Sequence, residues 1–205
     1  MKALNTAIAL GIGAATTAGL SLLNVNKDFV IGSTAVVMGA GLMIALKDKN
    51  DTNLKARNYE YFFNRAQDKF ELADYEEAIL DYNKALELSP TEICLVYSMR
   101  GNAKRNSGDF DGAISDQNKA LDFDPLYADG YFNRGIAKFQ KGDFDGAIED
   151  YSQVLKINPK DSDAFFNRAN VKKEIGDMKG ACEDWRKAAD LGDDVAAKFL
   201  RKNCE

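Results

Sequence analysis

The chain has 205 residues, 29% of them charged, a net charge of −5 and no histidine. The missing histidine excludes Ser-His-Asp triads, the usual zinc sites and imidazole chemistry near neutral pH. The three cysteines are far apart without CxxC spacing, so we expect no metal site and free thiols suited to a reducing compartment.

Two uncharged runs occupy the first fifty residues, at 3–26 and 29–46. The second run has 18 residues and as a helix would reach about 27 Å, enough to cross a hydrocarbon core. A short loop separates the runs, and both contain glycines, through which helices pack in lipid. We therefore predict a transmembrane helical hairpin over residues 1–50, with spans at about 4–24 and 29–46.

Two other interpretations of this segment stay open. A secretory signal peptide would use Lys2 as its basic start and Thr16-Thr17-Ala18 as a poor cleavage site, but it leaves the second run unexplained. Alternatively, only the second run spans the membrane and the first lies at the interface.

The basic residues near the second run predict an orientation. Lys47, Lys49, Lys55 and Arg57 follow it, whereas Lys27 is the single cation of the loop between the runs. The positive-inside rule then places both termini in the cytoplasm. Residues 51–58 would form a short polar linker that holds the rest of the chain at the membrane surface.

From residue 59 onward, one pattern recurs four times with a period of 34 or 35 residues. The units are 59–93, 94–127, 128–161 and 162–193. Each carries a small residue at its eighth place and alanine at its twentieth. These shared positions are Ala66, Gly101, Gly135, Ala169, Ala78, Ala113, Ala147 and Ala181.

Each unit is predicted to form two helices joined by a tight turn. In the third unit Gly142 can end the first helix in a left-handed conformation, and Asp143 can cap the second helix. Pro159 stops that second helix, because proline disfavours helix in the residue before it.

The period, the prolines and the alternation of small and aromatic residues resemble the tetratricopeptide repeat (TPR) family. The resemblance covers residues 59–193 and is closest to the bacterial subtype with Tyr-x-Asn-Arg-Gly, here 131–135. It implies an all-α fold: a solenoid of four helix-turn-helix repeats. Residues 194–205 are predicted to add a capping helix and tail, with Val195 and Phe199 on one face.

The resemblance also implies a peptide-binding groove along the first helices. Its aromatic rings and asparagine amides suit an extended peptide. The residues at the implied positions are Phe63, Gln67, Phe70, Ser98, Asn102, Arg105, Phe132, Asn133, Ile136, Phe139, Phe166, Asn167, Asn170 and Lys173. The alternative is that Phe63, Phe132 and Phe166 pack against neighbouring repeats instead.

A well-known TPR groove clamps the C-terminal carboxylate of chaperones, and it needs several cations. Asn102 and Asn133 match that motif, but Ser98, Asp163 and Asn167 stand where cations are required. A carboxylate would be left unpaired, so we predict no chaperone clamp.

Arginine at the seventh place and aspartate at the twenty-third recur in register. We expect them to form structural ion pairs between helices rather than a ligand site. The residues are Arg65, Arg100, Arg134, Arg168, Asp81, Asp116, Asp150 and Asp184.

Charge and repeats together indicate a binding protein. Residues 1–50 carry a net charge of +2 and the remainder −7, which argues against a nucleic-acid partner and favours a basic or amphipathic protein. We expect a membrane-anchored scaffold, without catalysis or cofactor, that binds a protein or peptide for assembly of a complex at the membrane. A structural self-associating membrane protein is the alternative.

Overall fold

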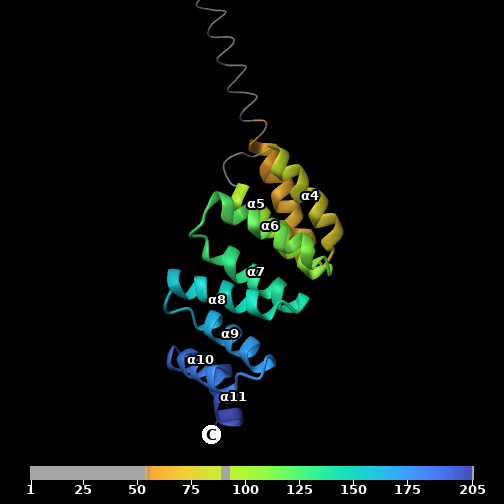
Figure 1. Ribbon diagram of the computed structural model, residues 1–205. Helices are drawn as coiled ribbons and strands as arrows, with labels where there is room; N and C mark the ends of the chain where they lie inside the picture. Colours follow the sequence, from red (N-terminus) through yellow and green to blue (C-terminus); the bar gives the residue numbers. More distant parts are fainter. Residues whose placement is uncertain (1–53, 55, 89–92, 205) are drawn as a thin grey trace, which may run out of the picture. The chain divides into compact units, whose positions relative to one another are not determined.

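The computed structural model describes residues 54, 56–88 and 93–204 (Figure 1). The predicted membrane hairpin and half of the predicted linker (51–53 and 55) lie outside these residues, so their structure stays a prediction. The chain divides into Met1–Lys55 and Ala56–Glu205, and the second unit is the one described below. None of the described helices is long and apolar enough to cross a membrane.

The described part of the second unit is built from helices and contains no strand. A helix over residues 56–71 comes first, in orange in Figure 1. It is followed by α4 (Tyr75–Leu88), α5 (Ile93–Asn106), α6 (Phe110–Phe123), α7 (Ala128–Lys141), α8 (Phe144–Ile157), α9 (Ser162–Glu174), α10 (Met178–Asp190) and α11 (Asp194–Cys204).

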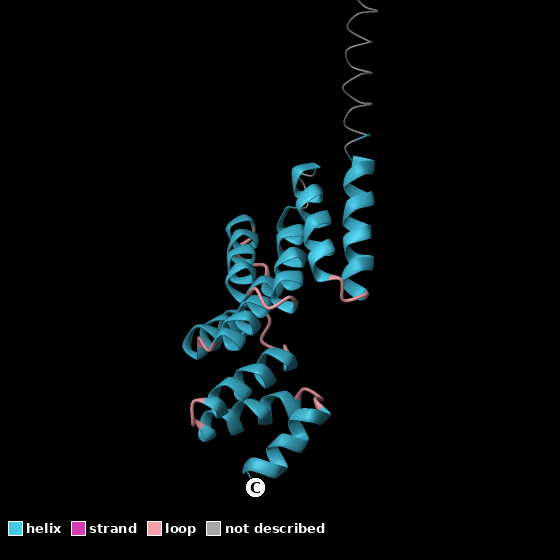
Figure 2. Ribbon diagram, turned by 90° about the vertical axis from the view of Figure 1, so that its right-hand side faces the viewer, coloured by secondary structure: helices cyan, strands magenta, loops and turns pink. Residues whose placement is uncertain are grey.

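These helices form consecutive hairpins, as the TPR resemblance implied (Figure 2). The first helices are 56–71, α5, α7 and α9, and the second helices are α4, α6, α8 and α10. Each second helix also packs against the first helix of the next unit, and α5 contacts α7 directly. Among the described first helices, α5 and α7 therefore adjoin one another directly.

The turns inside the hairpins follow from local chemistry. Gly142 has φ of +87° and ends α7 by donating its amide to Phe139 O at 3.0 Å. Asp143 then caps α8 by accepting a hydrogen bond from the Gly146 amide at 3.1 Å. The first unit has Ala73 at the equivalent turn, and it adopts φ of +61° despite its Cβ.

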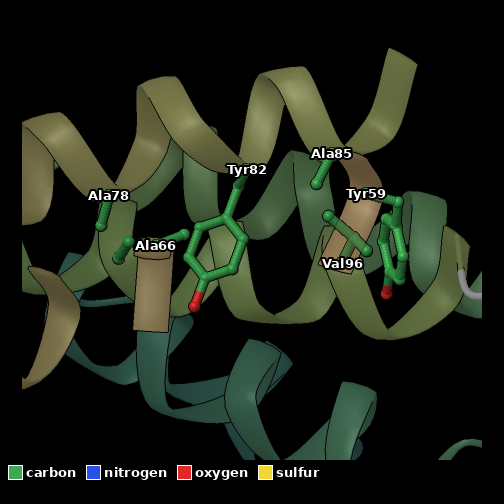
Figure 3. Packing of buried hydrophobic residues seen from close by; sticks show 7 residues of the cluster. Tyr59, Ala66, Ala78, Tyr82, Ala85 and Val96 are labelled. Carbon is green, nitrogen blue, oxygen red and sulfur yellow. The ribbon is translucent and has the colours of Figure 1, made fainter. Parts of the chain in front are cut away.

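The core lies between the two helices of each hairpin. In Figure 3 the Tyr82 ring lies beside Ala66 and Ala78, all fully buried. Glycine serves the same purpose in the third unit, where a Cβ on Gly135 would lie 3.1 Å from the Tyr151 ring. Small residues at the eighth and twentieth places thus make room for a large ring.

The second of the four repeats, residues 94–127, departs from this arrangement. It has Gln117 where the other units have Tyr82, Tyr151 and Trp185, and Gln117 is buried like those rings. Its Nε2 donates to Ser98 O at 3.0 Å, while its buried Oε1 has no hydrogen-bond partner.

Helix α11 covers the last hairpin, as expected, and it packs Phe199 inward but leaves Val195 exposed. Phe199 packs against Phe166 and Trp185, at centroid distances of 5.5 Å each, and Ala196 is fully buried. Val195, expected beside Phe199, is 49% exposed, because the buried face runs through Ala196, Phe199 and Leu200.

A disulfide corrects our expectation that all three cysteines are free thiols. Cys182 on α10 is bonded to Cys204 at the end of α11, with their Cα atoms 5.9 Å apart. The two residues are 22 positions apart in sequence, but the packing of α11 on α10 brings them together. Cys94 remains a free thiol.

Candidate functional site

The candidate site lies on the first helices, where the fourteen predicted groove residues fall. We call these fourteen residues the first-helix face. They lie on the 56–71 helix, α5, α7 and α9, in the order in which those helices follow one another along the stack.

The aromatic rings of this face are half-buried, and the structure shows what covers them. Phe63 lies 5.9 Å from Tyr82, and Phe132 lies 5.6 Å from Tyr151, both edge to face. Phe166 contacts Phe199 of the capping helix. The ring contacts of Phe63 and Phe132 lie within their own hairpins, whereas the packing alternative placed these rings against neighbouring repeats. The remaining surface of each ring stays accessible.

Phe70 and Phe139 repeat this arrangement near the C-terminal ends of their helices. Their partners, Tyr75 and Phe144, open the following helix at centroid distances of 5.5 and 5.7 Å. Ile136 is half-buried against the core of the third unit. The apolar part of the face is thus anchored by its own contacts and would not need a ligand to hold it in place.

The amides of the face divide into occupied and free. Asn167 Nδ2 donates to Asp163 O at 2.8 Å, and Asn170 Oδ1 accepts from Trp185 Nε1 at 3.2 Å. Asn133 and Gln67 are half-buried and form no side-chain hydrogen bond within the described residues. Asn133 and Gln67 are consequently the amides best able to pair with the backbone of an incoming peptide.

Ser98 does not belong to the accessible face. Its exposed fraction is 2%, and its backbone carbonyl accepts a hydrogen bond from the Gln117 side chain on α6. Gln117 and Ser98 form a polar contact at the level where other units place a ring against the first helix.

Two cations complete the face. Lys173 is exposed and lies 3.6 Å from Glu174. Arg105 is half-buried, and burial lowers the pKa of its guanidinium. In the part of the chain that the structure describes, no group of carboxylates or cysteines is placed to hold a metal ion.

Three segments of the chain match family models of this repeat. Residues 59–92 and 128–161 match models described as "Tetratricopeptide repeat", and residues 101–142 match one described as "TPR repeat". The chain contains tetratricopeptide repeats. A comparison with curated protein sequences found no match.

Solved TPR structures share this fold at low sequence identity. A crystal structure of MamA is 22% identical with a TM-score of 0.62, covering 73% of this chain and 86% of MamA. The TPR protein YrrB, described as having an unusual peptide-binding site, is 19% identical with a TM-score of 0.62, covering 80% of this chain and 88% of YrrB. The first TPR of Spaghetti (RPAP3), bound to the HSP90 peptide SRMEEVD, is 24% identical with a TM-score of 0.55, covering 58% and 94%. At such identities the likeness shows the fold alone.

The four arginines of the TPR units bind the four aspartates predicted for them. In the third unit Arg134 donates from Nε and Nη2 to the two oxygens of Asp150, at 2.9 and 2.6 Å. The same two-pronged contact joins Arg65 to Asp81, Arg100 to Asp116 and Arg168 to Asp184.

The third nitrogen of these guanidiniums is also occupied. In three units Nη1 donates to a second helix of the preceding unit: Arg100 to Asn83, Arg134 to Asn118 and Arg168 to Ser152. In the first unit Arg65 donates to Tyr61 instead. Each arginine thus joins helices, and little of it remains for a ligand.

A recurring lysine was missed from the sequence. Lys69, Lys104, Lys138 and Lys172 stand four residues after the arginines and lie 2.7–3.2 Å from the same aspartates. Their spacing was visible as lysine at the eleventh place of every unit. Each aspartate, almost fully buried, therefore has two cationic partners.

Proposed function

We propose that this chain is a scaffold whose first-helix face binds an extended protein segment. The observation that carries the proposal is the combination on one face of half-exposed rings with the free amides of Asn133 and Gln67. Rings bury apolar side chains, and amides pair with peptide backbone. Solved TPR proteins of the same fold, including one bound to a peptide, support a role in protein interaction.

The binding mode proposed here is not the chaperone clamp. Ser98 is buried, and Asn167 is bonded to the backbone of its own helix, so neither replaces the missing cations. We propose instead an amphipathic segment held by its backbone and apolar side chains. We further propose that residues 1–50 anchor the scaffold in a membrane as a helical hairpin, where it assists assembly of a complex.

A cross-linked pull-down tests the proposed face. Asn133→Asp keeps the size of the side chain but removes the amide donor and adds a charge. We expect it to lose partners captured by the wild-type chain from detergent-solubilised membranes. The control is Gln153→Glu on α8, which makes the same chemical change on a second helix. Equal capture by all three proteins would move the function away from the first-helix face.

Self-association is the alternative, and it has its own measurement. Residues 51–205 studied by size-exclusion chromatography should elute as a monomer under the scaffold proposal. A stable oligomer of this fragment would favour the structural membrane protein.

The proposed cytoplasmic location of the repeats has a direct chemical test. The distribution of lysines supports it, while the Cys182–Cys204 disulfide is the kind of bond that persists in oxidising compartments. Cells are quenched rapidly with acid, and the protein is then treated with PEG-maleimide, which reacts only with free thiols. In the proposed orientation Cys182 and Cys204 should be reduced and therefore labelled. Labelling only after reduction would contradict it and favour the exported form with a cleaved signal peptide.

A further inference from the structure

Arg105 stands apart from the other cations of the repeats. Among the described residues, the partly buried cations are the four arginines and four lysines bound to the buried aspartates, plus Arg105. The eight others have a carboxylate partner. Arg105 has none, and its buried Nε makes no hydrogen bond.

The surroundings of Arg105 do not supply the missing acceptor. The groups that interact with it electrostatically are the phenols of Tyr75 and Tyr151. Tyr75 belongs to the ring pair with Phe70 in the first unit, and Tyr151 to the ring pair with Phe132 in the third. Both phenols belong to neighbouring units, and no carboxylate is among the groups that act on the guanidinium.

A long basic side chain often covers apolar rings with its stem while its charged head reaches water. That role accounts for the buried Nε, but it does not explain why Arg105 alone of the nine partly buried cations has no carboxylate beside its charged head. Its Nη1 and Nη2 are not buried and make no hydrogen bond among the described residues, so these are the donors that a ligand can reach.

Asn102 provides a second donor on the same side of α5. It precedes Arg105 by three positions, a spacing that places two side chains on one helix face. Its Oδ1 lies 3.5 Å from Gln117 Nε2, which leaves the Asn102 Nδ2 donor without a hydrogen bond among the described residues. The second unit thus offers a guanidinium and an amide donor on one face of α5.

We propose that Arg105, with Asn102, binds an aspartate or glutamate side chain of the segment that occupies the first-helix face. A carboxylate matches the planar guanidinium in geometry and charge, and the half-buried position of Arg105 makes such a pair stronger than one in water. The partner is therefore an amphipathic segment with one acidic residue between apolar ones. This inference rests on the proposed function and adds a specificity that the overall negative charge of the repeats would not suggest.

A random-peptide library displayed on phage and selected against the full-length chain in detergent micelles tests this inference. We expect the selected peptides to share one Asp or Glu between apolar residues. A synthetic winner should bind wild type about tenfold or more tightly than its Asp→Asn or Glu→Gln version, as expected for a charge-assisted pair. Against Arg105→Gln the two versions should bind alike, while the control Arg186→Gln on α10 should behave as wild type.

The outcomes separate the role of Arg105 from the proposed peptide-binding function. Winners without an acidic preference, or winners that keep their preference on a folded Arg105→Gln, would overturn the role of Arg105 and leave the scaffold intact. No selected peptides at all would overturn the proposed peptide-binding function as well. Arg105→Lys keeps the charge but loses the paired geometry of the guanidinium. It should therefore retain only part of the preference for the acidic peptide.

Discussion

Asp150 illustrates how a charged residue is kept inside the repeat stack. Its exposed fraction is 1%, and it accepts from Arg134 and from Lys138 at 2.9 Å. A buried carboxylate is tolerated only when cations and hydrogen bonds replace its water. Because Arg134 also binds Asn118 of the preceding unit, the pair fixes how two units are placed against each other.

Arg134→Leu should therefore act on stability and leave partner binding unchanged. We expect the free energy of unfolding in urea to fall by about 2–4 kcal/mol, less than for complete isolation of the carboxylate because Lys138 remains. Lys141→Leu is the control, since it removes an exposed pair with Asp111 worth about 0–1 kcal/mol. Loss of partner binding at unchanged stability would assign the arginines to a ligand site instead.

Ala73 gives a prediction of the opposite sign. It holds the left-handed turn conformation that Gly142 adopts in the third unit, and a Cβ makes that conformation costly. Ala73→Gly should raise the free energy of unfolding by about 0.5–1 kcal/mol, the strain being partly offset by the greater entropy of glycine in the unfolded chain. Gly142→Ala should lower it. A destabilised Ala73→Gly would show that the turn is not strained.

Stability should also depend on Asp81 in acid. Hydrogen bonds from Arg65, opposed by burial and helped by Lys69, lower the pKa of this carboxyl below its usual value. The stabilising contribution is complete above the usual Asp pKa of about 3.9 and is lost as pH falls through the lower folded value. Asp81→Asn should flatten the fall in unfolding free energy below about pH 4 in urea titrations. If the unfolding free energy of Asp81→Asn fell with pH as steeply as that of the wild type, this linkage would be contradicted.

At the scale of elements, the hairpins and the capping helix were predictable, but the disulfide at the end of the stack was not. Gly142 and Asp143 predict the turn between α7 and α8. A left-handed C-cap favours glycine and an N-cap favours aspartate, and both preferences depend only on neighbouring residues. Cys182 and Cys204 meet only because α11 packs back on α10, which spacing along the chain does not reveal.

The predicted face failed at one position for the same reason. Ser98 occupies a groove-facing place in the repeat pattern, but burial at that place depends on the residue opposite it. The Gln117 side chain donates a hydrogen bond to the Ser98 backbone carbonyl, which an aromatic ring at that place could not do. The recurring lysines were missed although their spacing is as regular as that of the arginines.

The disulfide should stabilise the capping helix. It closes a loop across a sequence separation of 22 residues, for which chain entropy predicts about 3 kcal/mol. We expect reduction to lower the unfolding free energy by about that amount and to raise amide exchange first in α11. Cys94→Ser, which removes the free thiol, should respond to reductant as wild type does. If Cys94→Ser no longer lost stability on reduction, the Cys182–Cys204 bond would be contradicted.

At the scale of the whole molecule, the repeats form a stack in which Arg100, Arg134 and Arg168 each tie their unit to the preceding one. The first-helix face runs along the first helices of this stack. Its rings are held by the hairpin cores, so the face is formed before any partner arrives. A preformed surface of this kind lowers the cost of ordering on binding. The membrane hairpin, which lies outside the described residues, would hold that face near its partners.

Site-specific photo-cross-linking tests the central claim most directly. A photoreactive residue at Gln67, on the first-helix face, is compared in membranes with the same residue at Lys119, exposed on the second helix α6. We predict a cross-linked partner band from position 67 that is absent from position 119. Bands from position 119 alone, or equal bands from both, would contradict binding on the first-helix face.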